Sequence, residues 1–260
     1  MDIGYIFSGF LVGLLVGVTG VGGGSLMTPL LVFLFGFKPA VAVGTDLLFA
    51  AITKTGGVFV HHGSHKSVEW RIVALLATGS LPASIATLYA LNHFAKIGKD
   101  ISHIMTFTLG IALILTAFAL IYRCALQRKG NIEDRHTPER FQHLQDPMTV
   151  VIGLVLGVLV TMSSVGAGAL GTVALLFLYP RLPTLKVVGT DLAHAIPLTA
   201  IAGFGHWQLG NVDFTLLGSL LIGSLPGIWI GSHLSAKIPE KYLRPILASI
   251  LMLIGLKFVL

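Results

Sequence analysis

The sequence predicts an all-α polytopic membrane protein of two inverted repeats, each a re-entrant broken-helix hairpin followed by three transmembrane helices. Three observations predict this fold: the composition, a duplication along the chain, and glycine-rich breaks inside apolar segments. Of the 260 residues, 54% are hydrophobic and 11% are charged, and the mean hydropathy is +0.87. Soluble domains carry about 25% charged residues. The composition therefore places the chain among integral membrane proteins.

Apolar stretches long enough to cross a bilayer, which takes about 20 residues, recur along the chain. They cover residues 41–60, 72–91, 104–122, 214–230 and 243–260. The net charge of +6 is not accompanied by a basic stripe interleaved with aromatic residues, so no nucleic-acid partner is expected. In a membrane protein an excess of Lys and Arg orients the chain instead.

The chain also repeats itself at a spacing of 144 to 145 residues. The segment VGTDL at 43–47 recurs at 188–192, and GSLP at 79–82 recurs at 223–226. Chance could supply one such match but not several in the same order. We therefore expect a first membrane repeat over residues 1–122, a cytoplasmic linker over 123–147 and a second membrane repeat over 148–260.

Each repeat begins with an apolar block, residues 4–37 and 148–180, that is long for one crossing and short for two. If this block crossed once, the Lys and Arg residues outside the membrane would divide eight against eight between the two sides. If it is a re-entrant hairpin, the halves are inverted and the division is twelve against four, in agreement with the positive-inside rule. Two full short spans would give the same division. We adopt the hairpin, with both termini in the periplasm and the linker in the cytoplasm.

The glycine-rich break in each first block predicts a binding site. Non-helical backbone survives inside a membrane only where it is buried in protein or lines a cavity, and broken helices at a repeat interface are typical of secondary transporters. A half-helix that begins near Ser25 would direct its free N–H groups and positive dipole end at the break, where glycines admit a close ligand. Such a site favours anions. The residues expected to contact the substrate are Gly22, Gly23, Gly24, Ser25, Thr28, Thr45, Lys54, Gly166, Gly168, Thr172 and Thr190.

Some glycines have a simpler interpretation. Gly9, Gly13 and Gly17 are spaced by four residues, which is typical of helices that pack closely through small residues. The run Gly22-Gly23-Gly24 has no packing period, which favours the binding-site interpretation for that run.

Ionisable residues inside predicted spans are functional hypotheses by default. Asp46 and Asp191 occupy equivalent positions in the two repeats. Because carboxylates repel an anion, they would serve proton coupling or gating, with His194 one helical turn after Asp191 as a relay. The structural alternative is that each aspartate caps the N-terminus of a half-helix.

Lys54 has no counterpart in the second repeat, where Thr199 stands. Three roles are open for it. It would neutralise the substrate anion, pair with an aspartate, or extend to the membrane interface.

The motif Gly20-Val21-Gly22-Gly23-Gly24, followed by Thr28-Pro29-Leu30 and Ala42-Val43-Gly44-Thr45-Asp46, has a degenerate second copy. This pattern resembles the sulfite exporter TauE/SafE family, also called the 4-toluene sulfonate uptake permease family, over nearly the whole chain. The resemblance implies a multi-pass transporter of a bacterial or archaeal cytoplasmic membrane, exporting sulfite, sulfoacetate or other organosulfonates. Alanine and serine replace glycines in the second copy, so the two hairpins are expected to contribute unequally.

Two other classes compete with an anion transporter. A membrane-embedded hydrolase is disfavoured because HExxH, GxSxG and paired catalytic carboxylates are missing from the sequence, so we expect no enzyme. A divalent transition-metal permease using His and Asp is the alternative, although the histidines lack ligands at metal-binding spacing. Without a GxxxxGK[ST] motif, the energy would come from an ion or substrate gradient. We expect no cofactor and no bound metal; the partners are a small anion, membrane lipid and protons, and a homodimer is compatible with the sequence.

Overall fold

The computed structural model describes residues 3–19, 24–65, 68–97, 101–128, 144–235 and 240–260. Over this part of the chain it consists of ten α-helices and no strands. The predicted all-α class is confirmed.

The helices follow the predicted apolar blocks, and the first block of each half is divided in two. The first half contains α1 (Ile3–Thr19), α2 (Gly24–Phe33), α3 (Pro39–His65), α4 (Trp70–Lys96) and α5 (Ser102–Arg128). The second half contains α6 (Gln145–Ser163), α7 (Leu170–Leu178), α8 (Thr184–Gln208), α9 (Phe214–Ser235) and α10 (Glu240–Val259). The helix α2 begins at Gly24, close to the predicted start near Ser25, so the expected half-helix is present.

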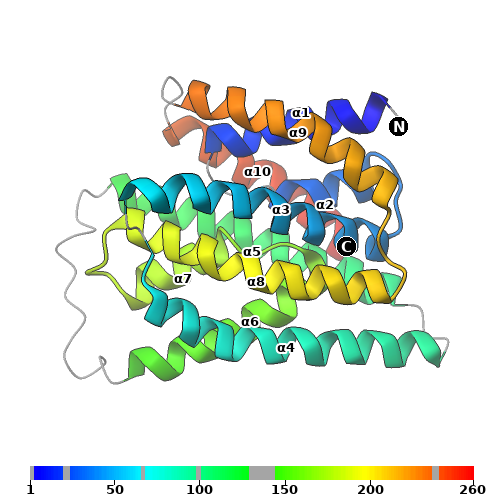
Figure 1. Ribbon diagram of the computed structural model, residues 1–260, viewed down its shortest axis with the longest axis horizontal. Coiled ribbons are helices and arrows are strands. Elements are labelled where there is room, and N and C mark those ends of the chain that lie inside the picture. Colours follow the sequence, from blue (N-terminus) through cyan, green and yellow to red (C-terminus); the bar gives the residue numbers. More distant parts are fainter. Residues whose placement is uncertain (1–2, 20–23, 66–67, 98–100, 129–143, 236–239) are drawn as a thin grey trace.

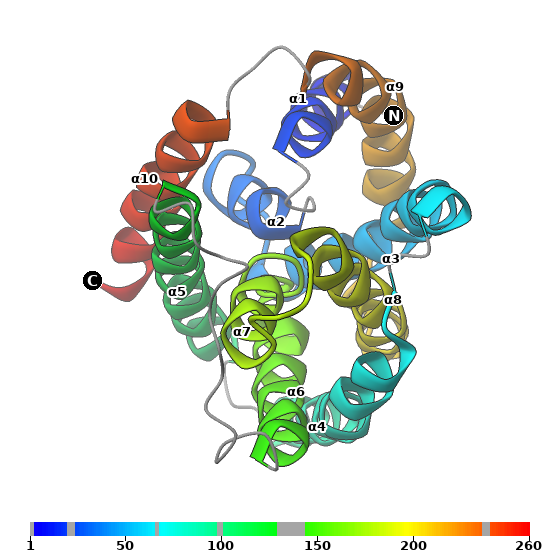
Figure 2. The same cartoon turned by 90° about the vertical axis from the view of Figure 1, so that its left-hand side faces the viewer.

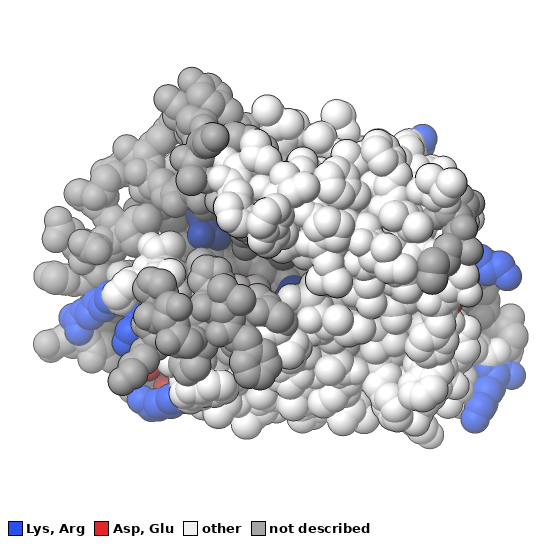
Figure 3. Space-filling model, turned by 45° about the horizontal axis from the view of Figure 1, so that its top comes forward, with Lys and Arg blue, Asp and Glu red and all other residues white. Residues whose placement is uncertain are grey.

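Five of the described helices are long and apolar enough to cross a membrane, in agreement with a polytopic membrane protein. The spans are Trp70–Lys96, Ser102–Cys124, Gln145–Ser163, Thr184–Gln208 and Phe214–Gly231. On the face shown in Figure 3, Lys and Arg side chains gather toward the two ends of the molecule, and a wide band between them is mostly uncharged. This distribution suits a protein that exposes its middle to hydrocarbon.

The long helices run along the long axis of the molecule (Figure 1). The N- and C-terminal ends lie toward one end of the bundle. At the opposite end, α5 ends and α6 begins. A view along the bundle shows the short helices α2 and α7 inside, with the longer helices around them (Figure 2). Thr28 of α2 and Thr172 of α7 are buried near the helix starts, whereas Phe177 near the end of α7 is exposed.

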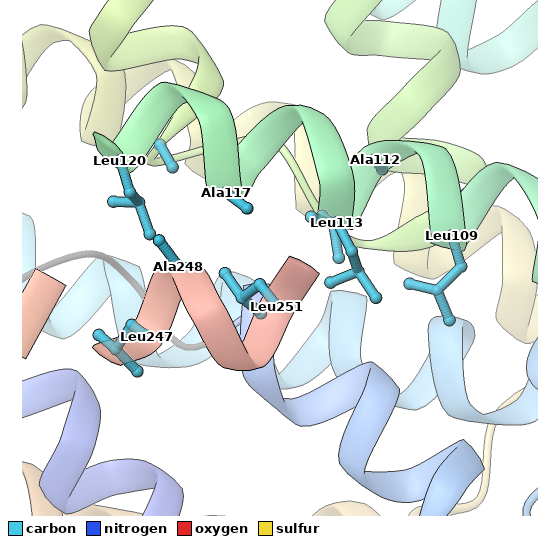
Figure 4. Packing of buried hydrophobic residues seen from close by; sticks show 10 residues of the cluster. Leu109, Ala112, Leu113, Ala117, Leu120, Leu247, Ala248 and Leu251 are labelled. Carbon is cyan, nitrogen blue, oxygen red and sulfur yellow. The ribbon is translucent and has the colours of Figure 1, made fainter. Parts of the chain in front are cut away.

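The principal helix pairs join one half of the chain to the other. They are α1 with α9, α4 with α6, α3 with α8, and α5 with α10. In the last pair, Leu109 and Leu113 of α5 belong to the same buried apolar cluster as Leu247 and Leu251 of α10 (Figure 4). Each half therefore buries its apolar faces largely against the other half.

Glycines permit the closest of these contacts. A Cβ atom on Gly9 would lie 2.5 Å from the carbonyl oxygen of Leu220, and one on Gly13 would lie 2.4 Å from that of Ser224. The packing role predicted for these two glycines is confirmed. Equivalent contacts recur 144 residues away between α4 and α6, where Gly153 lies on Leu76 and Gly157 lies on Ser80.

We expect Gly223→Val to destabilise the protein, because a Cβ atom there would lie 1.9 Å from the carbonyl oxygen of Ile6. Overpacking of this kind costs about 1–3 kcal/mol or more. Thermal unfolding in detergent measures the effect. Gly218→Val is the matched control, since a Cβ atom at that position on the same helix meets nothing within 4 Å. Equal melting temperatures for the two variants would contradict the packing role.

Candidate functional site

Each short helix begins beside a buried aspartate from the helix that follows it. The hydroxyl of Thr28 on α2 donates a hydrogen bond of 2.5 Å to Oδ2 of Asp46 on α3. In the second half, the hydroxyl of Thr172 on α7 donates one of 2.9 Å to Oδ2 of Asp191 on α8. Both aspartates are fully enclosed, with 0% and 1% of their surfaces exposed.

These pairs suit the physics of a helix start. The first N–H groups of a helix have no partner within it, and the dipole makes that end favourable for negative charge. Asp191 lies directly against the first turn of α7, since a Cβ atom on Gly171 would be 2.0 Å from its Oδ1. The arrangement agrees with the capping alternative for the two aspartates, and leaves proton coupling as a proposal.

The break in the second hairpin uses backbone conformations that favour glycine. Gly166 and Gly168 have φ angles of 123° and 128°, and Ser164, at the end of α6, has a left-handed φ of 57°. Side chains are rarely tolerated at such angles, so these two glycines are needed for the turn itself. Their predicted role in substrate contact stays a prediction.

The corresponding break in the first hairpin lies outside the described residues. Gly22 and Gly23 fall in this segment. Gly24 and Ser25 begin α2, but the structure describes nothing of their side-chain surroundings.

Lys54 connects the two halves at the centre of the candidate site. Its Nζ donates a hydrogen bond of 3.0 Å to the carbonyl oxygen of Ala167, in the break of the second hairpin. It also interacts electrostatically with both Asp46 and Asp191. With 6% of its surface exposed, Lys54 does not extend to the membrane interface.

Several buried polar atoms in this region have no hydrogen-bond partner among the described residues. They are Oδ1 of Asp46, Oδ1 of Asp191, Oγ of Ser164 and Nδ1 of His194. Ser164 lies beside the carboxyl group of Asp46, and His194 is within electrostatic reach of Lys54. A buried unsatisfied group costs about 1–3 kcal/mol, so a cluster of them in an apolar bundle indicates a site adapted to a polar ligand.

Arg123 is a member of the central group that no motif in the sequence marks. It was expected to open the linker because the apolar stretch ends at Tyr122. Instead α5 continues to Arg128, and Arg123 is 9% exposed and acts electrostatically on Asp191. The central group thus contains two acidic and two basic side chains.

Thr45 and Thr190 use their hydroxyl groups outside the central group of charged side chains. The hydroxyl of Thr45 accepts a hydrogen bond of 3.1 Å from the backbone N–H of Asp213, and that of Thr190 accepts one of 3.0 Å from Glu69. Asp213 and Glu69 directly precede α9 and α4. These two threonines tie each half to the start of a helix in the other half.

His194 contacts α4 through one ring nitrogen, and its relay with Asp191 stays a prediction. Its Nε2 lies 2.8 Å from the hydroxyl of Ser80, while the carboxylate of Asp191 accepts from Thr172. Over the described residues, no group of three or more His, Cys, Asp and Glu side chains could hold a metal ion.

The family model described as sulfite exporter TauE/SafE matches residues 5–258. The probable membrane transporter protein YjnA of Bacillus subtilis (strain 168) is 39% identical over 263 residues, covering 100% of both chains. The probable membrane transporter protein MJ0441 of Methanocaldococcus jannaschii is 27% identical over 266 residues, covering 96% of this chain and 92% of its own. No solved structure matches the chain. The resemblance seen in the glycine motifs is confirmed, and the chain belongs to the sulfite exporter TauE/SafE family.

Proposed function

We propose that this membrane transporter is a secondary transporter that exports small sulfur-containing anions, such as sulfite, sulfoacetate or other organosulfonates. The observation that carries the proposal is the buried Lys54, whose Nζ lies 3.0 Å from the carbonyl of Ala167 in the second hairpin. An isolated buried ammonium is costly. A cation held at the break of a helix, beside the positive end of α7, suits an anionic ligand.

The substrate would accept a hydrogen bond from Lys54, either beside the carbonyl oxygen of Ala167 or in its place. An ammonium group has three donors, of which one is used by Ala167. Sulfite and sulfonate groups present several acceptor oxygens, so one of them would accept from Lys54 while the turn around Gly166 and Gly168 supplies backbone N–H groups. The first hairpin would contribute in the same way through Gly22, Gly23, Gly24 and Ser25, with Thr28 and Thr172 at the two helix starts.

Charge balance supports a role for protons. The cluster of Asp46, Asp191, Lys54 and Arg123 is neutral when all four side chains are ionised. A bound anion would leave one negative charge uncompensated in a buried setting, which is expensive. A proton on Asp46 or Asp191 would restore neutrality, so we assign coupling or gating to these two residues, assisted by His194.

We also propose an inverted arrangement of the two halves in the cytoplasmic membrane of a bacterium or archaeon. Each hairpin would return to its own side, and three helices of each half would cross. α5 ends and α6 begins at the end of the bundle opposite the termini, which supports an odd number of crossings in each half (Figure 1), as does the charge division of twelve against four. The relatives from Bacillus subtilis and Methanocaldococcus jannaschii support the location.

Transport by the purified full-length protein in liposomes tests the function. We expect uptake and counterflow of sulfite, sulfoacetate and simple sulfonates, because the site combines a fixed cation with helix-start N–H groups. Chloride, nickel and cobalt serve as comparison ions. Movement of a metal ion without any of the sulfur anions would contradict the proposal.

The second test concerns Lys54. We expect Lys54→Ala to weaken the apparent affinity for the anion about tenfold or more, which corresponds to ~1.4 kcal/mol or more, whereas Lys54→Arg retains part of it. Lys96→Ala, at the exposed end of α4, is the control. Unchanged affinity in Lys54→Ala, in protein that remains folded, would show that the lysine only holds the hairpin.

Cysteine labelling tests the membrane arrangement. In a Cys124→Ser background, Gly98→Cys should react with an impermeant thiol reagent in intact cells, because that loop is expected in the periplasm. Gly130→Cys should react only after the membrane is opened. Labelling of the Gly130 position in intact cells would refute the orientation.

A further inference from the structure

A row of buried polar side chains leads away from the central cluster between α4, α6 and α8. We name Thr161, Ser84, Ser80 and His194 the polar file. All four have 0% of their surface exposed. His194 Nε2 lies 2.8 Å from Ser80 Oγ, and the hydroxyl of Thr161 donates a bond of 2.7 Å to Ser84 Oγ.

The file continues toward the end of α8. Ser80 and Ser84 are four residues apart on α4, so their side chains are neighbours at about 5–6 Å, a gap that one water molecule can bridge. Beyond Thr161, the ring of His206 donates through Nε2 to the carbonyl oxygen of Thr161 over 2.9 Å. His206 lies twelve residues after His194, or about 18 Å along the helix.

The duplication supplies an internal comparison. At the equivalent positions on α3, α9 and α1, Phe49 replaces His194, Ile228 replaces Ser84 and Gly17 replaces Thr161. Only Ser80 has a polar counterpart, Ser224, whose hydroxyl bonds back to Leu221 of its own helix over 3.3 Å. The same scaffold is therefore built once with apolar residues and once with polar residues.

This difference is not required by the packing. The backbone contacts of Gly13 on Ser224 and of Gly157 on Ser80 are equivalent, at 2.4 Å each from the position of a Cβ atom. Buried hydroxyl and imidazole groups are costly unless they are hydrogen-bonded, and Nδ1 of His194 has no partner among the described residues. Polar groups that the set of α1, α3 and α9 does without indicate a function for those of α4, α6 and α8.

We propose that the polar file carries protons between the end of α8 and Asp191, so that protons enter and leave the central cluster through the side of the protein built by α4, α6 and α8. This inference rests on the proposed transport function and assigns its coupling route. A groove between α4 and α8, lined in part by Ile85, Asn92 and Gln208, opens beside the outer end of the file. Ile85, which follows Ser84 on α4, lines this groove, while Ser84 itself is fully buried.

The transfer involves only O–H and N–H bonds. A proton from water is accepted by the hydroxyl oxygen of Ser84, which releases its own proton toward Ser80, and Ser80 passes one to Nε2 of His194. The imidazolium then gives up the proton on Nδ1 to a carboxylate oxygen of Asp191, one turn earlier on α8, and becomes neutral. The carbonyl of Thr161 accepts but cannot pass on a proton, so His206 positions α6 and is not part of the relay.

The charges around His194 favour a carrier that does not retain the proton. Lys54 faces it electrostatically from α3, and Asp191 precedes it on its own helix. The described parts of α4 and α6 face it with hydroxyl groups, their charged residues lying toward the helix ends, and α7 contains no ionisable residue. A positive His194 is disfavoured by Lys54 and relieved by transfer to Asp191.

The test uses the full chain in liposomes with sulfoacetate, a pH-sensitive dye inside, and two readouts. Proton movement driven by a sulfoacetate gradient reports coupling, and sulfoacetate counterflow at equal pH reports the anion site. His194→Gln keeps a hydrogen bond to Ser80 but cannot carry a proton. We expect it to slow proton movement about 100-fold, in the range that a positioned proton carrier contributes, while counterflow persists. Ser80→Ala should act in the same direction.

Ser224→Ala is the matched control, because Ser224 occupies the position of Ser80 in the apolar set formed by α1, α3 and α9. It should leave both readouts unchanged. Proton movement that is normal in both His194→Gln and Ser80→Ala, or lost equally in Ser224→Ala, would overturn the route. Sulfoacetate counterflow by the unsubstituted protein without proton movement would overturn the route alone, whereas no flux of any sulfur anion would overturn the proposed function itself.

Discussion

The structure depends on how a helix can be interrupted where no water is available to its backbone. Hydrocarbon cannot satisfy the free N–H groups at a helix start, so each break needs its own partners. Asp46 and Asp191 approach the two helix starts from the next helix in the chain, and their carboxylates accept hydrogen bonds from the hydroxyls of Thr28 and Thr172. The long helices then enclose α2 and α7 (Figure 2). The acidic residues at the centre are thus part of the support of the fold as well as candidates for its chemistry.

The pairing of helices across the halves explains why the site lies between them. The first helix of each half packs on a helix of the other half, with glycines such as Gly9 and Gly153 allowing backbone to touch backbone. Thr45 and Thr190 add hydrogen bonds across the same boundary. Neither half therefore buries its apolar faces alone.

Much of this could be predicted from the sequence, because hydrophobicity and helix-breaking residues report directly on spans and breaks. The helices, the half-helix at Gly24 and the capping alternative for the aspartates follow from such patterns. The partners of side chains do not. Lys54 bonds to Ala167, which is 113 residues away, and Nε2 of His194 lies 2.8 Å from the hydroxyl of Ser80 on another helix. Such contacts depend on the rotation of each helix about its axis, which packing decides. Arg123 was missed because a charged residue at the end of an apolar stretch is also typical of a linker.

The departures from symmetry carry the clearest functional meaning. The two halves share packing glycines, such as Gly9 and Gly153, and the equivalent buried aspartates Asp46 and Asp191. Lys54 is replaced by Thr199 at the equivalent position of the other half, and His194 is replaced by Phe49. Lys54 and His194 both lie at the second hairpin. Lys54 bonds to its break, and His194 lies one turn from the aspartate that caps its half-helix. In the proposed transporter, the cation that meets the substrate and the group that relays the proton would therefore act on the same hairpin. Coupling would need only the second hairpin to respond to the substrate and to the proton. The first hairpin would then serve as its structural equivalent in the other half.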